Sequence, residues 1–147
     1  MSEEKKQKPV SEMNELELYF LIDFVGAFTW RMNHDMAHGR IPVADHAAID
    51  ADIIRLREEQ IAAIKELPRF GVVPFVEGKE RPTEAYWTWY RTWDGWKKDM
   101  TDEQWNAFNA ATKDGVTTEQ VANYKKEAFK ETTDAMVVDQ TVGRTAE

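Results

Sequence analysis

The sequence contains no cysteine, and both of its serines lie within the first eleven residues. A chain without cysteine has no disulfide framework, no thiolate metal site and no cysteine nucleophile. It also lacks a G-x-S-x-G nucleophile motif, and no glycine-rich loop precedes an expected helix. These absences exclude the familiar arrangements for nucleophilic catalysis and for phosphate binding.

Long hydrophobic runs are also missing. The longest, from Leu16 to Trp30, is interrupted by Asp23 and falls short of the roughly 20 apolar residues that a membrane span needs. The first residues, MSEEKKQKPVSE, are polar and mixed in charge, which is not the pattern of a secretory signal. We therefore expect no membrane span and a cytoplasmic location.

Acidic side chains outnumber basic ones by 27 to 19, which gives a net charge of −8. Direct nucleic-acid binding is not expected, because phosphate contacts need clustered Lys and Arg. An acidic protein that mimics a nucleic acid is one alternative. Such a mimic should carry dense rows of carboxylates, whereas the acids here are interspersed with bases, as on a solvated surface.

The length of 147 residues fits one domain. We expect disordered tails at residues 1–10 and 140–147, which have little to bury. Residues 11–139 are expected to form a single all-α domain, a bundle of about five helices with a long N-terminal helical hairpin.

The first helix is expected to begin after Ser11 or Asn14 and to run to about His38, before Gly39. One side of it is apolar, comprising Leu18, Leu21, Val25, Phe28, Met32 and Met36, and Leu16, Phe20, Phe24 and Ala27 widen that face. A second helix follows a short connector, with Pro42 in its first turn, and continues to Leu67 before Pro68. Such a connector makes the two helices an antiparallel hairpin.

The helical pattern fails between residues 69 and 82, where glycines and prolines alternate with Phe70, Val72, Val73, Phe75 and Val76. We expect an ordered loop packed onto the bundle, because these apolar side chains favour burial. A mobile lid is the alternative.

The stretch from Glu84 to Phe108 holds five of the six tryptophans, two of the four tyrosines and one phenylalanine. Thr and aromatic residues favour strands, and Trp93-Asp94-Gly95-Trp96 is compatible with a hairpin turn. A helix is favoured by spacing, because one face collects Tyr86, Trp89, Tyr90, Trp93, Trp96 and Met100. We predict a third helix that is rich in aromatic residues and capped by Thr83.

Two shorter helices are predicted beyond it. Thr101 and Gln104 match a capping box at the start of the fourth helix. The fifth is expected to begin at Thr117 or Thr118 and to end at about Val138.

If the aromatic stretch is helical, most of its rings belong to the core, and Trp87 points about 100° away from Tyr86. Exposed tryptophans are enriched in binding hot spots, and Trp87 with Arg91 at i+4 can form a cation–π pair facing a partner. The predicted partner-binding residues are Trp87, Arg91, Trp96 and Trp105.

All three histidines lie between residues 34 and 46. His34 and His38 share a helical face, and the hairpin would bring His46 to the same corner, so the three can form a site for a divalent metal such as Zn, Mn or Fe. The simpler interpretation is that His34, His38 and Arg40 interact favourably with the helix dipole at its C-terminal end.

The string HDMAHG, residues 34–39, resembles the local signature of the HD-type metal phosphohydrolases, a helical family in which a His-Asp pair binds metal. The resemblance covers only this string. The separate upstream histidine of that family has no counterpart, because no histidine precedes His34.

The preferred hypothesis is a non-enzymatic protein-interaction module (an adaptor, inhibitor or assembly subunit) that uses an aromatic patch on its acidic helical bundle to bind another protein. A homo-oligomer is compatible with the same surface. The alternatives are a metal-dependent hydrolase centred on His34, His38 and His46, and an acidic nucleic-acid mimic.

Overall fold

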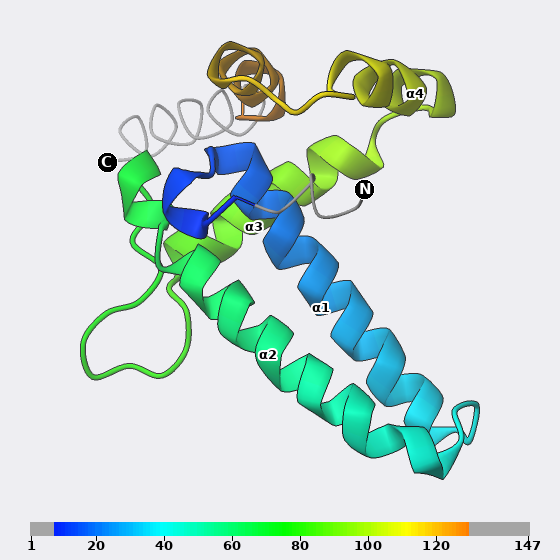
Figure 1. Ribbon diagram of the computed structural model, residues 1–147. Coiled ribbons are helices and arrows are strands. Elements are labelled where there is room, and N and C mark those ends of the chain that lie inside the picture. Colours follow the sequence, from blue (N-terminus) through cyan, green and yellow to red (C-terminus); the bar gives the residue numbers. More distant parts are fainter. Residues whose placement is uncertain (1–7, 130–147) are drawn as a thin grey trace, which may run out of the picture. The chain divides into compact units, whose positions relative to one another are not determined.

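The computed structural model describes residues 8–129, in which helices are the only regular secondary structure and no strand occurs. The α-helices are α1 (Glu15–Ala37), α2 (His46–Ile64), α3 (Glu84–Lys98), α4 (Asp102–Ala111) and a fifth over residues 118–129 (Figure 1). The all-α prediction is therefore confirmed. None of the helices within this part of the chain has the length and hydropathy that a membrane crossing requires.

The chain divides into two compact units, Met1–Gly78 and Lys79–Glu147. The first contains α1 and α2, and the second contains α3, α4 and helix 118–129. The expected single domain over 11–139 stays a prediction. The tail at 140–147 and the end of the fifth helix near Val138 lie outside the described residues, as does most of the tail at 1–10.

Helix α1 is fixed at both ends by local hydrogen bonds. At its start, the Asn14 side chain accepts a bond from the Glu17 amide, and the Glu17 carboxylate accepts one from the Asn14 amide, each at 2.9 Å. At its end, Gly39 takes a left-handed conformation (φ 70°), and the Arg40 amide donates to the Asp35 carbonyl at 2.9 Å. This Schellman-type turn is favoured at glycine because it has no Cβ.

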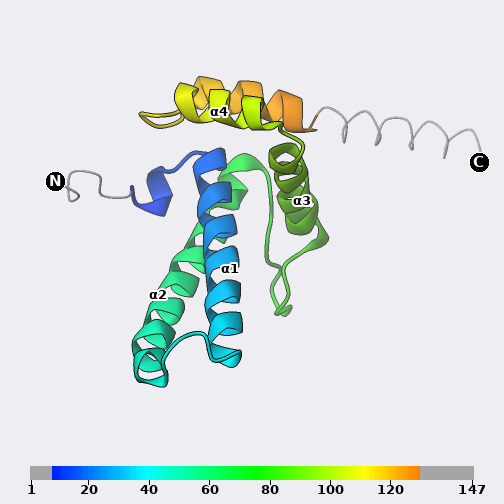
Figure 2. The ribbon, with the colours of Figure 1, turned by 90° about the vertical axis from the view of Figure 1, so that its right-hand side faces the viewer.

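The chain then turns through a short 3-10 helix, Val43–Asp45, into α2. Helices α1 and α2 run side by side in two views (Figures 1 and 2). The Gln60 amide of α2 donates to the Ile22 carbonyl of α1 at 3.0 Å. Next to this bond lies Gly26, where an added Cβ would be 3.6 Å from Gln60 Nε2, an ordinary van der Waals distance.

The buried stripe of α1 differs in part from the predicted one. Leu18 and Val25 are buried as expected, but Ile22 and Thr29 are buried too, whereas Phe24 is exposed. Helix α1 is apolar around most of its circumference, so periodicity alone does not select the face that packs. The other buried residues in the described part of this unit are Met13, Glu15, Leu16, Tyr19, Ile53, Ala63, Ile64, Leu67 and Pro74.

Helix α2 ends at Ile64, three residues before the predicted end, and Pro68 lies within a 3-10 helix, Leu67–Phe70. Arg69 in this turn donates from its Nη2 to the carbonyls of Val10 and Met13 at 2.9 and 3.0 Å. Its Nε is 2.8 Å from the Glu66 carboxylate. The tightened turn thus lets one guanidinium tie the segment before α1 to the end of α2.

The segment predicted as a packed loop, 69–82, forms the end of this 3-10 helix and an irregular stretch up to α3. Pro74 is buried and Phe75 is half-buried, but Val73 and Val76 are 56% and 51% exposed. The expectation that all of its apolar side chains are buried is therefore wrong for these two valines.

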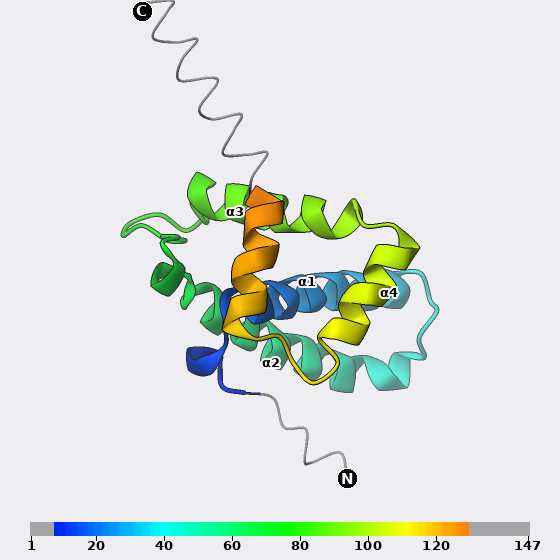
Figure 3. The same cartoon turned by 90° about the horizontal axis from the view of Figure 1, so that it is seen from above.

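In the second unit, three threonines begin the three helices. The side chain of Thr83 accepts from the Tyr86 amide at 3.2 Å, so the aromatic stretch is a helix and not a hairpin of strands. Thr101 and Gln104 exchange bonds of 2.8 and 3.1 Å, and Thr117 and Gln120 do the same at the same distances. Figure 3 shows α4 and helix 118–129 following α3 in this order.

These caps give a direct stability test. We expect Thr101→Ala to lower the free energy of unfolding by about 1 kcal/mol, because the Gln104 amide loses its acceptor. Thr88→Ala is the matched control, since Thr88 is an exposed residue within α3. Alanine favours the helix interior, so this change should be neutral or slightly stabilising. Urea unfolding followed by circular dichroism measures both, and equal losses in the two variants would contradict the capping role.

Candidate partner-binding site

The second unit is built around an aromatic cluster that comprises Trp93, Trp96, Trp105, Phe108, Tyr124 and Phe129. Trp93 is fully buried, and its ring lies 5.3 Å from the rings of both Trp96 and Phe129, edge to face. These centroid distances and perpendicular planes are the preferred geometry of aromatic pairs. The contact with Trp93 therefore holds the ring of Trp96 in its orientation.

Trp96 in turn meets one ring from each of the other two helices. Its centroid is 5.7 Å from that of Phe108 on α4 and 5.5 Å from that of Tyr124 on helix 118–129. Phe108 and Tyr124 are themselves 5.2 Å apart. Behind them, Trp105 stacks on Phe108 at 5.4 Å with an interplanar angle of 19°. The three helices thus each contribute one ring to a closed triangle.

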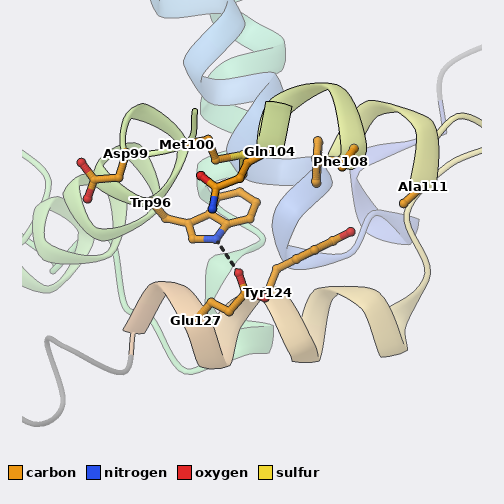
Figure 4. A pocket seen from close by; sticks show the side chains of 9 residues that line it. Trp96, Asp99, Met100, Gln104, Phe108, Ala111, Tyr124 and Glu127 are labelled. Atoms are coloured by element: carbon orange, nitrogen blue, oxygen red, sulfur yellow. Dashed lines mark hydrogen bonds between the residues drawn. The ribbon is translucent and has the colours of Figure 1, made fainter. Parts of the chain in front are cut away.

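An open pocket of about 540 Å³ lies against this triangle (Figure 4). Its apolar surface comes from both aromatic and aliphatic side chains, and its polar groups come from all three helices. The lining residues are Trp96, Asp99, Met100, Gln104, Ala107, Phe108, Ala111, Tyr124 and Glu127. The volume is within the range of sites that bind small ligands or inserted side chains.

Two carboxylates give the pocket its charge. Glu127 lies 3.5 Å from the indole Nε1 of Trp96, which donates to it (Figure 4), and Asp99 lies at the end of α3. Two nearby bases have contacts outside the pocket: Lys98 pairs with Asp94 at 3.0 Å, and the Lys125 ammonium lies 5.6 Å from the Phe129 ring centroid. The lining contains no Lys or Arg, so the pocket is aromatic and acidic.

Two of the four predicted partner-binding residues belong to this pocket or support its wall. Trp96 lines the pocket, and Trp105 supports its Phe108 wall. Trp87 lies nine residues before Trp96, about 14 Å along the helix axis, and is 39% exposed. Arg91 forms an ion pair with Glu84 at 2.8 Å, so its charge is engaged within α3. A partner-facing pair of Trp87 and Arg91 stays a prediction.

Sequence reasoning did not select Tyr124 and Glu127, or the Phe108 wall, as site residues. The signal that could have found the two rings is a short repeated pattern. Residues 101–104 and 117–120 are both Thr-x-Glu-Gln, and each is followed by an aromatic ring seven residues after its threonine, Phe108 and Tyr124. Equal caps and equal spacing place these rings at equivalent positions on their helices.

The predicted metal site lies in the other unit, and its histidines are arranged as a stack. Trp30 and His34 lie on α1 and His38 caps its C-terminal end. Their ring centroids are 4.9 and 4.1 Å apart in this order, with nearly parallel planes. His38 Nδ1 is 2.9 Å from the His34 carbonyl, and His46 Nε2 is 3.0 Å from the Ile41 carbonyl. Across residues 8–129, no three His, Cys, Asp or Glu side chains are grouped so that they could hold a metal ion.

The same unit has a second hollow of about 580 Å³ beside this stack. It is lined by Gly26, Thr29, Trp30, Asn33, His34, Ala37, His38, Arg57 and Gln60. No carboxylate lines it, so no carboxylate metal ligand is available there.

The surface carboxylates of both units are often paired with bases close in sequence. Asp35 lies within 4 Å of Arg31 and Arg40, at 3.8 and 3.4 Å. Asp52 lies 3.4 Å from Arg55. Such exposed pairs contribute little stability, but they break up the one-signed rows that a nucleic-acid mimic needs.

No protein-family model, curated protein or solved structure matches the chain. The functional inference therefore rests on the geometry of its own residues.

The histidine arrangement predicts the outcome of a metal analysis. We expect purified protein to carry no stoichiometric Zn, Mn or Fe, and its melting temperature to be unchanged by a chelator, because three ligands are not brought together. Elemental analysis of wild type and His34→Ala measures this. Bound metal in the wild type that is lost in His34→Ala would restore the metal-site hypothesis.

Trp93 and Trp87 of α3 differ in burial, so replacing each by alanine should lower the free energy of unfolding by different amounts. Trp93→Ala should lower the free energy of unfolding by about 3–5 kcal/mol, because it leaves a cavity at a fully buried position. Trp87→Ala should lower it by only about 1 kcal/mol, since its ring is partly exposed and contacts Tyr86 and Tyr90. Urea unfolding compares the two, and a larger loss in Trp87→Ala would place Trp87 in the core.

Proposed function

We propose that this protein is a non-enzymatic protein-interaction module that binds a segment of another protein in the pocket of its second unit. The observation that carries the proposal is the pocket itself: an open hollow with three aromatic walls and two carboxylates. A cytoplasmic location is part of the same proposal.

Aromatic side chains support such a role because they offer a large contact area at a low cost in conformational entropy. Trp and Tyr are enriched in binding hot spots, where a well-packed pocket excludes water around an inserted anchor. Trp96 and Tyr124 are only half-buried, and each has a polar atom that can pair with a ligand. The rings are held by one another, so little ordering remains to be done on binding.

The chemistry of the lining disfavours an enzyme. It contains no Ser, Cys, His or Lys, so the Ser–His and Cys–His pairs of nucleophilic catalysis are missing from it. Its titratable groups are Asp99, Glu127 and the Tyr124 hydroxyl. Neither the metal-dependent hydrolase nor the nucleic-acid mimic has a comparable observation in its favour.

The test fills the pocket without removing any of its walls. Ala107 and Ala110 are both exposed residues of α4, but only Ala107 lines the pocket. We expect Ala107→Trp to block partner binding, because the new side chain occupies the space the partner would take, and Ala110→Trp to leave binding intact. Capture from a lysate of the native host with each tagged variant, read by quantitative mass spectrometry, measures the difference.

Both variants should melt within a few degrees of wild type, which circular dichroism checks. Proteins retained by wild type and Ala110→Trp but lost with Ala107→Trp are partners of the pocket. The proposal fails if every captured protein survives Ala107→Trp.

A further inference from the structure

Resting on the proposed function, we infer that the pocket recognises an arginine side chain on the partner protein. The pocket combines two features that a guanidinium needs at the same time, aromatic faces and carboxylate acceptors. Both come from residues on the three helices of one unit, so the combination does not depend on a mobile segment.

The first feature is the aromatic wall. Trp96, Phe108 and Tyr124 all line the pocket. Their rings are tilted against one another at 82°, 46° and 61°, so the planes of the three rings differ in orientation around the hollow. A cation placed over such a face is attracted by the ring quadrupole, most strongly by that of Trp.

The second feature is the pair of acids. At 3.5 Å, the bond from Trp96 Nε1 to Glu127 is long for an N–H···O bond. The Glu127 carboxylate therefore keeps acceptor capacity for a stronger, charge-assisted donor. Asp99 adds a second negative charge to the same lining. An apolar side chain in this place would desolvate both carboxylates without pairing either of them.

Arginine fits better than lysine because of its shape. The planar guanidinium can stack on a ring and at the same time donate in its plane to a carboxylate, whereas an ammonium is a compact, strongly hydrated point charge. The net charge of −8 also favours the approach of a basic segment over that of an acidic one.

The experiment uses the full chain labelled with ¹⁵N and four capped pentapeptides, alanine-rich, with arginine, lysine, citrulline or leucine at the centre. Citrulline has the shape of arginine without its charge. The indole Nε1–H signal of Trp96, assigned with Trp96→Phe, reports binding because this N–H donates to Glu127. We expect the arginine peptide to shift this signal and to bind about tenfold more tightly than the citrulline peptide. Lysine should lie between them.

The matched variants are Glu127→Gln and Glu119→Gln. Both acids are exposed residues of helix 118–129, but only Glu127 lines the pocket. Glu127→Gln should reduce the affinity for the arginine peptide about tenfold, and Glu119→Gln should leave it unchanged. Both variants keep the fold if the other indole signals do not move.

The inference is overturned if the Trp96 signal does not respond to the arginine peptide, if citrulline or leucine binds as well as arginine, or if the two Gln variants weaken binding equally. The proposed function is decided separately by partner capture. If Ala107→Trp still abolishes capture while the arginine peptide does not bind, the pocket is a partner site for another kind of side chain.

Discussion

The mutual packing of aromatic rings is the interaction on which the second unit depends. Trp93 is fully buried and holds Trp96 and Phe129 edge to face. Trp96 then joins Phe108 and Tyr124, so each of the three helices is attached through a ring. The same contacts leave one side of this triangle against an open pocket, which links the stability of the unit to the surface proposed to bind a partner.

Local chemistry made much of the fold predictable. Capping residues can be recognised in a sequence, because their side chains accept hydrogen bonds from amides in the first turn of a helix. Asn14, Thr83 and Thr101 cap their helices in this way. The helical spacing of Tyr86, Trp89 and Trp93 identified the side of α3 that is buried. The strand preference of Thr and Trp did not prevail, because the cap and the 3.6-residue period both favoured a helix.

Features that depend on tertiary packing were harder to predict. Helix α1 is apolar around most of its circumference, so sequence could not show that Ile22 is buried and Phe24 exposed. The pocket was predicted only in part, since Trp96 was selected as a tryptophan of the aromatic stretch but Tyr124 and Glu127 lie on a later helix. Their approach to Trp96 depends on the turn between α4 and helix 118–129, and periodicity within one helix carries no information about that turn.

The central claim, that a partner segment enters the aromatic and acidic pocket, is tested most directly by photo-crosslinking in the native host. A benzophenone amino acid is placed at position 107 in one protein and at position 110 in a second, and the cross-linked products are sequenced by mass spectrometry. We expect position 107 to yield a discrete partner protein, joined next to an arginine, and position 110 to yield little of it. An absence of cross-links at 107, or equal yields of the same product at both positions, would contradict the claim.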